Sequence, residues 1–329
     1  MLSGCSRGDQ RVVVACAQDR EFAEGVFAEF EKAHKLSIAA KYDTEANKSV
    51  GLAAELVAEV SRPRVDVHWN NEILATIRLA RKGVYAKYTS PNAKPFPDWT
   101  HAPDGTWQAF AARARVLIVN TKIVPEADRP HSIFDLTNPK WKGKVAIAKP
   151  LFGTTATQAA CLFEVLGRDD AKAFYRGILA NEVGLVAGNK QVAVDVASGR
   201  FAMGLTDTDD AITELNDGKS VAIIYPDRDG HPKHSRLGVL FIPNTLAVIE
   251  KGPNPKGAHL LIDELLKVET ETTLAEGGGY QIPLNPKVHA KLHPALVKPT
   301  DVKVMDVNFE KAADLWDEVQ EFLRNEIVK

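Results

Sequence analysis

The sequence predicts an α/β protein of two lobes, in which two doubly wound sheets are joined by two long hinge strands. Residues 11–83 alternate three apolar strand patterns with three helical patterns, and residues 143–215 contain a second series of this kind. Such alternation is typical of largely parallel sheets covered by helices. Two long extended stretches, 107–120 and 236–252, follow these two series. A hinged body of this kind has a cleft between its lobes.

Hydrophobic periodicity predicts each element in chain order. The first series has expected strands at 11–17, 36–42 and 65–69, and expected helices at 21–34, 47–60 and 71–83. The second has expected strands at 143–148 and 200–206, and expected helices at 154–167, 169–179, 191–199 and 209–215. A further helix is expected at 256–269, after the second long stretch.

These elements predict the domain organisation. The expected units are a tether at 1–10, lobe 1 at 11–110 plus 242–290, lobe 2 at 111–241, and a C-terminal helical segment at 291–329 that packs on the lobes. The last part of lobe 1 follows lobe 2 in the chain, so both long strands must pass between the lobes.

Charge and composition exclude several partners. The chain has 329 residues, of which 45% are hydrophobic, enough for each lobe to bury a core. Its 41 basic and 43 acidic residues nearly cancel and form no long run of one sign, so we expect no nucleic acid and no anionic membrane as partner. No apolar run reaches the roughly 18 residues of a membrane-spanning helix. We expect a monomer.

The first residues resemble part of a targeting signal. Leu2-Ser3-Gly4-Cys5 resembles the lipobox of bacterial lipoproteins, which implies that Cys5 is lipidated and anchors the chain to a membrane. The alternative is an N-terminus with an incidental cysteine. Cys16 and Cys161 lie in predicted core elements, and we expect plain core residues rather than a disulfide or a metal pair.

Acidic side chains follow several predicted strands. Because ligands bind beyond the carboxyl ends of the strands in doubly wound sheets, the loops there are expected to meet at one cleft. The carboxylates on these loops are Asp19, Asp43, Glu45, Glu72, Asp207, Asp209 and Asp210. Trp69 lies on one of the loops and is a candidate wall of the site, although core packing is the alternative. The sequence therefore predicts an acidic cleft.

Helix capping is the alternative explanation for the aspartates. Asp207 has the position of an N-cap residue, and Asp210 lies in the first helical turn, where the helix dipole favours a carboxylate. Asp209 has no such role. Clustered carboxylates repel one another unless they are solvated or paired with a cation.

Several phrases carry a family resemblance across nearly the whole chain. They are "VDVHWNNE", "KGKVAIAKPLFGTTAT", "FAMGLTDTDDA" and "IPNTLAVIEKGPNPKGAHLLIDELL". The sequence resembles the periplasmic substrate-binding proteins of ABC importers, and within them the ferric-ion-binding branch. The resemblance implies the class II type of two-lobed fold, no catalysis, and delivery of a captured solute to a permease in the inner membrane.

The same resemblance implies a set of candidate ligands. Asp19 is at the place of that branch's histidine, and Asn71 is at the place of its glutamate, with Glu72 next to it. Asp209 and Asp210 replace the two adjacent tyrosines, so a typical ferric site is not expected. If the ligand is a metal ion, the candidate ligands are Asp19, Glu72, Asp209 and Asp210, which suit a hard cation. We expect no cofactor, only a metal ion carried as the transported ligand.

An anion-binding feature accompanies the acidic one. Thr154 and Thr155 enter a predicted helix after Gly153, where backbone N–H groups favour anions. Asn189 matches by position an asparagine that holds an anion in the resembled branch, whereas a second such asparagine is Asp207 here. Ordinary capping is the alternative.

These features leave three functions open. The first is capture of a cation or metal ion for uptake. The second is capture of an aminophosphonate or other zwitterion, with its acid group at Thr154, Thr155 and Asn189 and its amine among the carboxylates. The third, and the least favoured, is a carboxylate-dependent hydrolase, for which no nucleophile or metallohydrolase motif is found.

Overall fold

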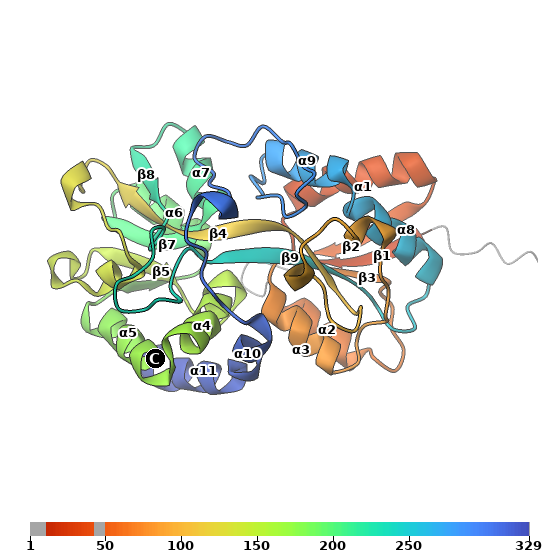
Figure 1. Ribbon diagram of the computed structural model, residues 1–329, viewed down its shortest axis with the longest axis horizontal. Coiled ribbons are helices and arrows are strands. Elements are labelled where there is room, and N and C mark those ends of the chain that lie inside the picture. The colour runs from red at the N-terminus through yellow and green to blue at the C-terminus, as the bar shows by residue number, and fades with distance from the viewer. Residues whose placement is uncertain (1–10, 43–49, 329) are drawn as a thin grey trace, which may run out of the picture.

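A computed structural model describes residues 11–42 and 50–328, which form two lobes with long strands between them (Figure 1). The right-hand lobe contains β1 (Arg11–Cys16), α1 (Arg20–His34), β2 (Ser37–Tyr42), α2 (Val50–Ala58), β3 (Val67–Asn70), α3 (Ile73–Arg81), α8 (Pro255–Leu265) and α9 (Val268–Glu276). The left-hand lobe contains β5 (Val145–Ala148), α4 (Gly153–Leu166), α5 (Arg168–Ala180), β6 (Gly184–Val186), α6 (Asn189–Ala197), β7 (Met203–Asp207), α7 (Thr208–Asn216) and β8 (Val221–Ile224).

Two long strands run between the lobes. They are β4 (Gln108–Asn120) and β9 (Phe241–Val248), and they pair antiparallel. The strand order is β2-β1-β3-β9-β4-β7-β5-β6, with β8 paired to β4 outside this path. Within each lobe β1 pairs parallel with β2 and β3, and β5 pairs parallel with β6 and β7. The predicted α/β fold, with two sheets joined by two connecting strands, is confirmed.

β4 belongs to both lobes. Gln108–Ala114 pair with β9, whereas Arg115–Val119 pair with β7. All residues of β4 are buried. The pairing partner therefore changes between Ala114 and Arg115, and the side chains on either side of this step face the junction of the lobes.

Local sequence explains most of the element boundaries. In α1 the buried side chains Ala23, Val26, Phe27 and Phe30 recur at helical spacing. The helix ends at Lys35, which adopts the left-handed conformation with φ of 55°. The short strands β6 and β8 were not predicted, and neither was α9 as a helix separate from α8, because these elements are brief and lack a clear period.

The C-terminal helices lie against both lobes. They are α10 (Phe309–Asp314) and α11 (Trp316–Phe322). The helical segment expected at 291–329 contains α10 and α11. α10 contacts α3 and α4, which belong to different lobes, and α11 contacts α4 (Figure 1). Arg81 of α3 pairs with Glu310 at 2.7 Å and with Asp314 at 2.9 Å.

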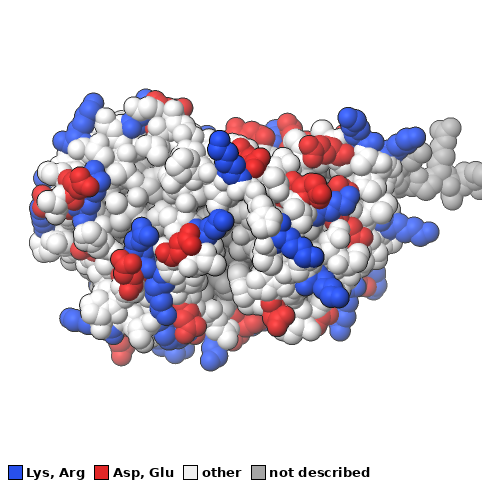
Figure 2. All heavy atoms as spheres, turned by 45° about the horizontal axis from the view of Figure 1, so that its top comes forward, with Lys and Arg blue, Asp and Glu red and all other residues white. Residues whose placement is uncertain are grey.

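Surface charge is mixed. On the face drawn in Figure 2, acidic and basic side chains alternate and no patch of one sign dominates, in keeping with the near-zero net charge. Cys16 and Cys161 are buried in their core elements, β1 and α4. In the described part of the chain, every helix is too short or too polar to span a bilayer. Cys5 and the loop carrying Asp43 and Glu45 lie outside the described residues.

A β-bulge in β4 lies just before the lobe junction. Its register shifts at Ala111, which has φ of 38°, a strained value for a residue with a side chain. The carboxylate of Glu271, on α9, accepts hydrogen bonds from the backbone N–H groups of Ala111, Leu284 and Asn285. Glu271 therefore holds the bulge and the returning chain together.

We predict that Glu271→Ala lowers the free energy of unfolding by about 3 kcal/mol, because it leaves three buried N–H groups without an acceptor. Urea unfolding followed by circular dichroism measures this. Glu269→Ala, on the exposed side of the same helix, is the control and should change stability by less than about 0.5 kcal/mol. Equal effects of the two changes would show that Glu271 does not support the bulge.

Candidate functional site

A cavity of about 460 Å³ lies where the lobes meet. It is lined by the starts of α1, α4, α6 and α7, by the loop before α3, and by β4. Of its 20 lining residues, seven are acidic and three are basic. The carboxyl ends of strands from both lobes thus meet at an acidic cavity, and Asp19, Asn71, Thr154, Thr155, Asn189, Asp207, Asp209 and Asp210 line it together.

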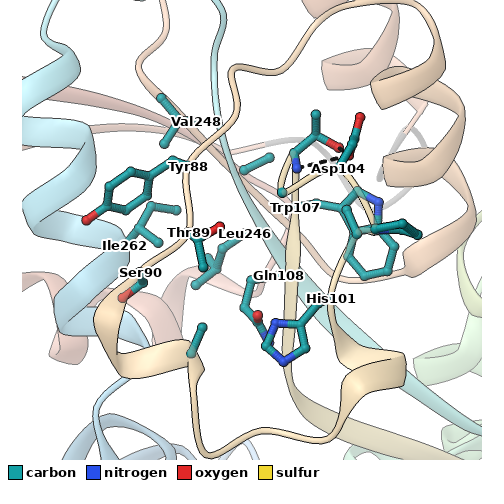
Figure 3. Close-up of a pocket in the computed structure, with 16 residues that line it drawn as sticks. Tyr88, Thr89, Ser90, His101, Asp104, Trp107, Gln108, Leu246, Val248 and Ile262 are labelled. Carbon is teal, nitrogen blue, oxygen red and sulfur yellow. Dashed lines mark hydrogen bonds between the residues drawn. The ribbon is translucent and has the colours of Figure 1, made fainter.

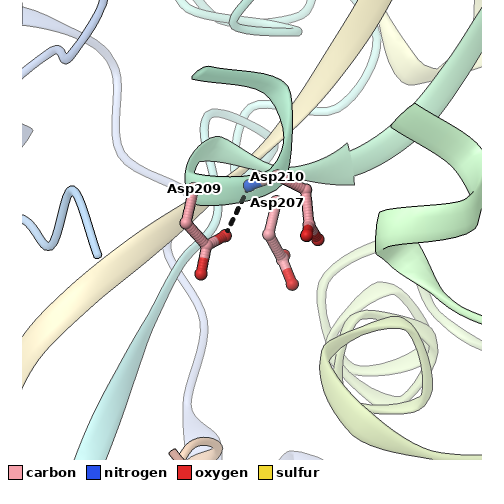
Figure 4. A group of neighbouring side chains, drawn as sticks. All are labelled: Asp207, Asp209 and Asp210. Carbon is pink, nitrogen blue, oxygen red and sulfur yellow. Dashed lines mark hydrogen bonds between the residues drawn. The ribbon is translucent and has the colours of Figure 1, made fainter. Parts of the chain in front are cut away.

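Three of the aspartates form one cluster at the end of β7 and the start of α7. One oxygen from each of Asp207, Asp209 and Asp210 lies within 4.8 Å of the others. Figure 4 shows the three carboxylates pointing to the same side of α7. Their environments differ, and this difference separates a structural aspartate from two that are available to a ligand.

Asp207 is the structural member. Its carboxylate accepts hydrogen bonds from Arg115 Nη1 at 2.7 Å, Thr154 Oγ1 at 2.6 Å and Asn189 Nδ2 at 3.0 Å. Arg115 is completely buried and Asp207 is 2% exposed. A buried ion pair of this kind needs every remaining donor satisfied, and Arg115 also donates to Gln158, Asn189 and Thr155.

This network corrects two expectations. Asp207 occupies the N-cap position of α7 but makes no capping bond with its side chain, which turns toward Arg115 instead. Within the first turn, Asp209 Oδ1 accepts the N–H of the next residue, Asp210, at 3.1 Å (Figure 4). Thr154 and Asn189, expected to hold a ligand anion, here hold the chain's own carboxylate.

Asp209 and Asp210 are less well compensated. Asp209 Oδ2 lies 3.6 Å from Arg113 Nη1, which is longer than a hydrogen bond. Burial raises the pKa of Asp209, and Asp207 and Asp19 add to this rise against the opposing effect of Arg113. Burial also raises the pKa of Asp210 well above its usual range, with Asp209 and Asp207 as further causes. A ligand cation would relieve this repulsion.

Glu72 and Trp69 lie outside the cavity lining. The Glu72 carboxylate caps α3 by accepting from Leu74 and Ala75, and it accepts the hydroxyl of Thr157 on α4 at 2.7 Å. It is 2% exposed and joins the two lobes. Trp69 is fully buried between Phe27 and Phe110, so it belongs to the core and does not wall the site.

Sequence reasoning missed Arg113 and Arg115. The signal was present in "AARARVLIV", where two arginines alternate inside an otherwise apolar strand. Residues at i and i+2 share one face of a strand, and a charge buried there must have a partner. The partners of Arg115 lie 39 to 92 residues away.

A second cavity, of about 310 Å³, lies between β4, β9 and α8 (Figure 3). Several of its polar groups are already paired: Tyr88 donates to Asp263, Gln108 to Thr100, and Thr106 to Asp104. It brings together no cluster of carboxylates, so the acidic cavity is the stronger candidate.

Residues 75–312 match the family of bacterial extracellular solute-binding proteins. The chain belongs to this family. Its architecture agrees: the iron-bound HitA of Pseudomonas aeruginosa superposes with a TM-score of 0.84 over 96% of this chain and 98% of that one, at 20% identity.

Curated relatives of this solute-binding protein have different described ligands. It is 26% identical to Iron uptake protein A1 of Synechocystis over 65% of this chain and 61% of that protein. It is 24% identical to the Major ferric iron-binding protein of Neisseria meningitidis over 84% of this chain and 82% of that protein. It is 25% identical to the Putative 2-aminoethylphosphonate-binding periplasmic protein of Salmonella typhimurium over 60% of this chain and 57% of that protein.

We predict that Asp210→Asn stabilises the ligand-free solute-binding protein at neutral pH. The folded-state pKa of Asp210 lies above its usual 3.8, so ionisation of this half-buried carboxyl costs stability as the pH rises. The gain in stability of the Asp210→Asn variant should be full at pH values above the folded-state pKa of Asp210. It should be absent at pH values below the pKa of this carboxyl group in the unfolded chain.

Thermal unfolding between about pH 3.5 and about pH 8 tests this. The melting temperature of the variant should exceed that of the unchanged protein by about 2 °C or more at the upper end. Asp217→Asn, at the exposed C-terminal end of α7, is the control. A gain that is equally large at both ends would contradict the explanation.

Proposed function

We propose that this protein is the solute-binding component of an ABC import system and captures a cationic solute in the acidic cavity. It binds without catalysis and presents the solute to a permease in the inner membrane. Family membership and the two-lobed fold support the binding role. The hydrolase alternative has no support among the relatives.

The observation that carries the cation is the state of Asp209 and Asp210. Arg115 already neutralises Asp207, whereas Asp209 lacks a hydrogen bond to Arg113 and Asp210 faces two neighbouring carboxylates. Both carboxyl groups line the cavity. A cation that binds there replaces carboxylate repulsion with charge-assisted attraction and displaces a proton from any carboxyl still protonated.

A metal ion and an organic ammonium group both meet this requirement. For a metal ion we propose Asp19, Asp209 and Asp210 as the ligands. Glu72 joins the set only if it gives up its cap on α3. The described cavity lining contains no tyrosine, so its oxygen ligands suit a hard cation rather than a phenolate-bound ferric ion.

The second candidate ligand is an aminophosphonate. One relative carries that description, and the cavity volume of about 460 Å³ accommodates a small organic molecule. Phe22 and Phe152 add apolar surface to the lining.

We further propose that lobe 1 is 11–110 plus 242–290 and lobe 2 is 111–241, and that they close on the ligand about β4 and β9. The segment 291–329 packs on both. Lipidation at Cys5 would hold the monomeric protein in the cell envelope. Globomycin, which blocks lipoprotein signal cleavage, should leave a longer precursor if Cys5 is processed.

Native mass spectrometry with elemental analysis of the purified protein tests the ligand class. We expect either a metal ion that a chelator removes or a small organic mass carrying an amine. The proposal would be overturned if calorimetric titration of the purified protein showed no binding of Mn²⁺, of Fe³⁺ or of any amine.

We predict that replacing both Asp209 and Asp210 by Asn lowers the affinity for the cation by at least about 100-fold, since each lost charged contact contributes about 1.5–3 kcal/mol. Isothermal titration calorimetry measures the change, and circular dichroism checks the fold. Asp217→Asn is the matched control on the same helix. Unchanged affinity would leave Asp209 and Asp210 with capping roles alone.

A further inference from the structure

Unsatisfied hydrogen-bond donors belong to one residue of the cavity lining, Arg113, and to its hydrogen-bond partner Gln18, which is not itself a lining residue. Arg113 lines the cavity and is 5% exposed, and its Nη2 donates to Gln18 Oε1 at 2.8 Å. Within residues 11–42 and 50–328, neither Arg113 Nε nor Gln18 Nε2 has a hydrogen-bond partner. Gln18 is 2% exposed and lies directly beside the guanidinium.

Such donors are costly in a folded protein. A buried donor without an acceptor has lost its hydrogen bonds to water without replacing them, and this cost is larger when the donor is charged. Asp209 forms an ion pair with Arg113 but does not remove this cost. Its Oδ2 lies 3.6 Å from Arg113 Nη1, which is longer than a hydrogen bond. An acceptor on a bound ligand would satisfy these donors.

Arg115 provides an internal comparison. It lies two residues further along β4, on the same face of the strand, and is also buried. Its Nε donates to Gln158 and its Nη1 donates to Asp207. Arg115 is thus completed by the protein, whereas Arg113, in the same strand, is not.

We propose that the ligand is a compact zwitterion, whose acid group binds Arg113 and Gln18 and whose ammonium group binds Asp209 and Asp210. This inference rests on the proposed function and adds a second charge to its ligand. Because Arg113 and Asp209 are only 3.6 Å apart at their nearest atoms, the two ligand charges are separated by one or two carbons.

This proposal places the acid group of the ligand at Arg113 and Gln18, not at Thr154, Thr155 and Asn189, where the sequence placed it. Thr154 and Asn189 are bonded to Asp207, and the hydroxyl of Thr155 is bonded to Asn189. A simple amine or a bare metal ion would leave the Arg113 donors unsatisfied and add a positive charge beside the guanidinium. Amino acids and aminoalkylphosphonates share the required chemistry.

Calorimetric titration of the full protein, freed of ligand by dialysis with chelator, tests the second charge. The probes are glycine, β-alanine, 2-aminoethylphosphonate, propylamine and Mn²⁺. We expect at least one of the three zwitterions to bind at least about tenfold more tightly than propylamine, a difference of about 1.4 kcal/mol. Comparison of β-alanine with 2-aminoethylphosphonate distinguishes a carboxylate from a phosphonate source.

The failures of the two proposals are distinguishable. Propylamine or Mn²⁺ binding as tightly as the best zwitterion would overturn the zwitterion and leave cation capture intact. An absence of binding by all five probes would overturn the zwitterion, and with the Fe³⁺ titration also negative it would overturn cation capture.

Gln18→Glu tests the position of the acid group. The change is nearly isosteric and keeps the acceptor for Arg113, but it replaces the unpartnered donor by a negatively charged oxygen. We expect the best zwitterion to bind at least about tenfold more weakly and propylamine to bind as well as before or more tightly. A merely structural role would change both affinities in the same direction, and that result would overturn the proposal.

Two further variants complete the test. Arg113→Lys keeps the charge but loses the planar set of donors, so it should weaken zwitterion binding more than propylamine binding. Lys122→Gln changes the net charge by the same amount as Gln18→Glu at an exposed position outside the cavity lining. It should leave every affinity unchanged.

Discussion

The ion pair between Arg115 and Asp207 is excluded from water, and the geometry of the cavity depends on it. Taking two charges out of water costs several kcal/mol per ion unless each remaining donor and acceptor is bonded. Thr154 on α4 and Asn189 on α6 donate hydrogen bonds to the Asp207 carboxylate, while Gln158 accepts one from Arg115. One pair therefore fixes the starts of α4, α6 and α7 relative to β4. Loss of either partner would leave an uncompensated charge where these elements meet.

The charged residues next to this pair, Arg113, Asp209 and Asp210, are in a different environment. β4 changes pairing partner between Ala114 and Arg115, so Arg113 lies on the side of one lobe and Arg115 on the side of the other. The protein itself supplies every partner of Arg115. The donors of Arg113 and the carboxyl groups of Asp209 and Asp210 are left incompletely compensated in the same cavity. The same residue types thus form a completed structural ion pair at one position and an incompletely compensated cluster two residues away.

The fold was largely predictable from sequence because its signals are local. The long strand at 107–120 and the helices predicted between 154 and 269 have recognisable patterns, and the carboxyl ends of the strands brought most of the candidate aspartates to one cavity. The partners of these side chains were not predictable, since they depend on contacts between distant residues. Arg115 and Asp207 are 92 residues apart, and Glu72 and Thr157 are 85 apart. Trp69 stands at the end of a predicted strand, where a lone tryptophan is more often a core residue than a wall of the site, and its packing against Phe110 places it in the core.

The contact between Glu72 and Thr157 bears on how ligand binding couples to lobe movement. It is buried and links the start of α3 in one lobe to α4 in the other, and α10 bridges the same two helices. These contacts stabilise the arrangement of the lobes without any ligand. In the proposed closure, ligand binding must supply the free-energy difference between the open and closed arrangements of the lobes. Contacts that favour the closed arrangement reduce this difference, so the apparent affinity rises with the fraction of protein that is closed without ligand. If the lobes close on the ligand as proposed, Glu72 would affect affinity through the equilibrium between open and closed forms, whereas Asp209 and Asp210 would affect it through direct contact. A residue that the resemblance placed among the ligands acts here by holding the lobes together.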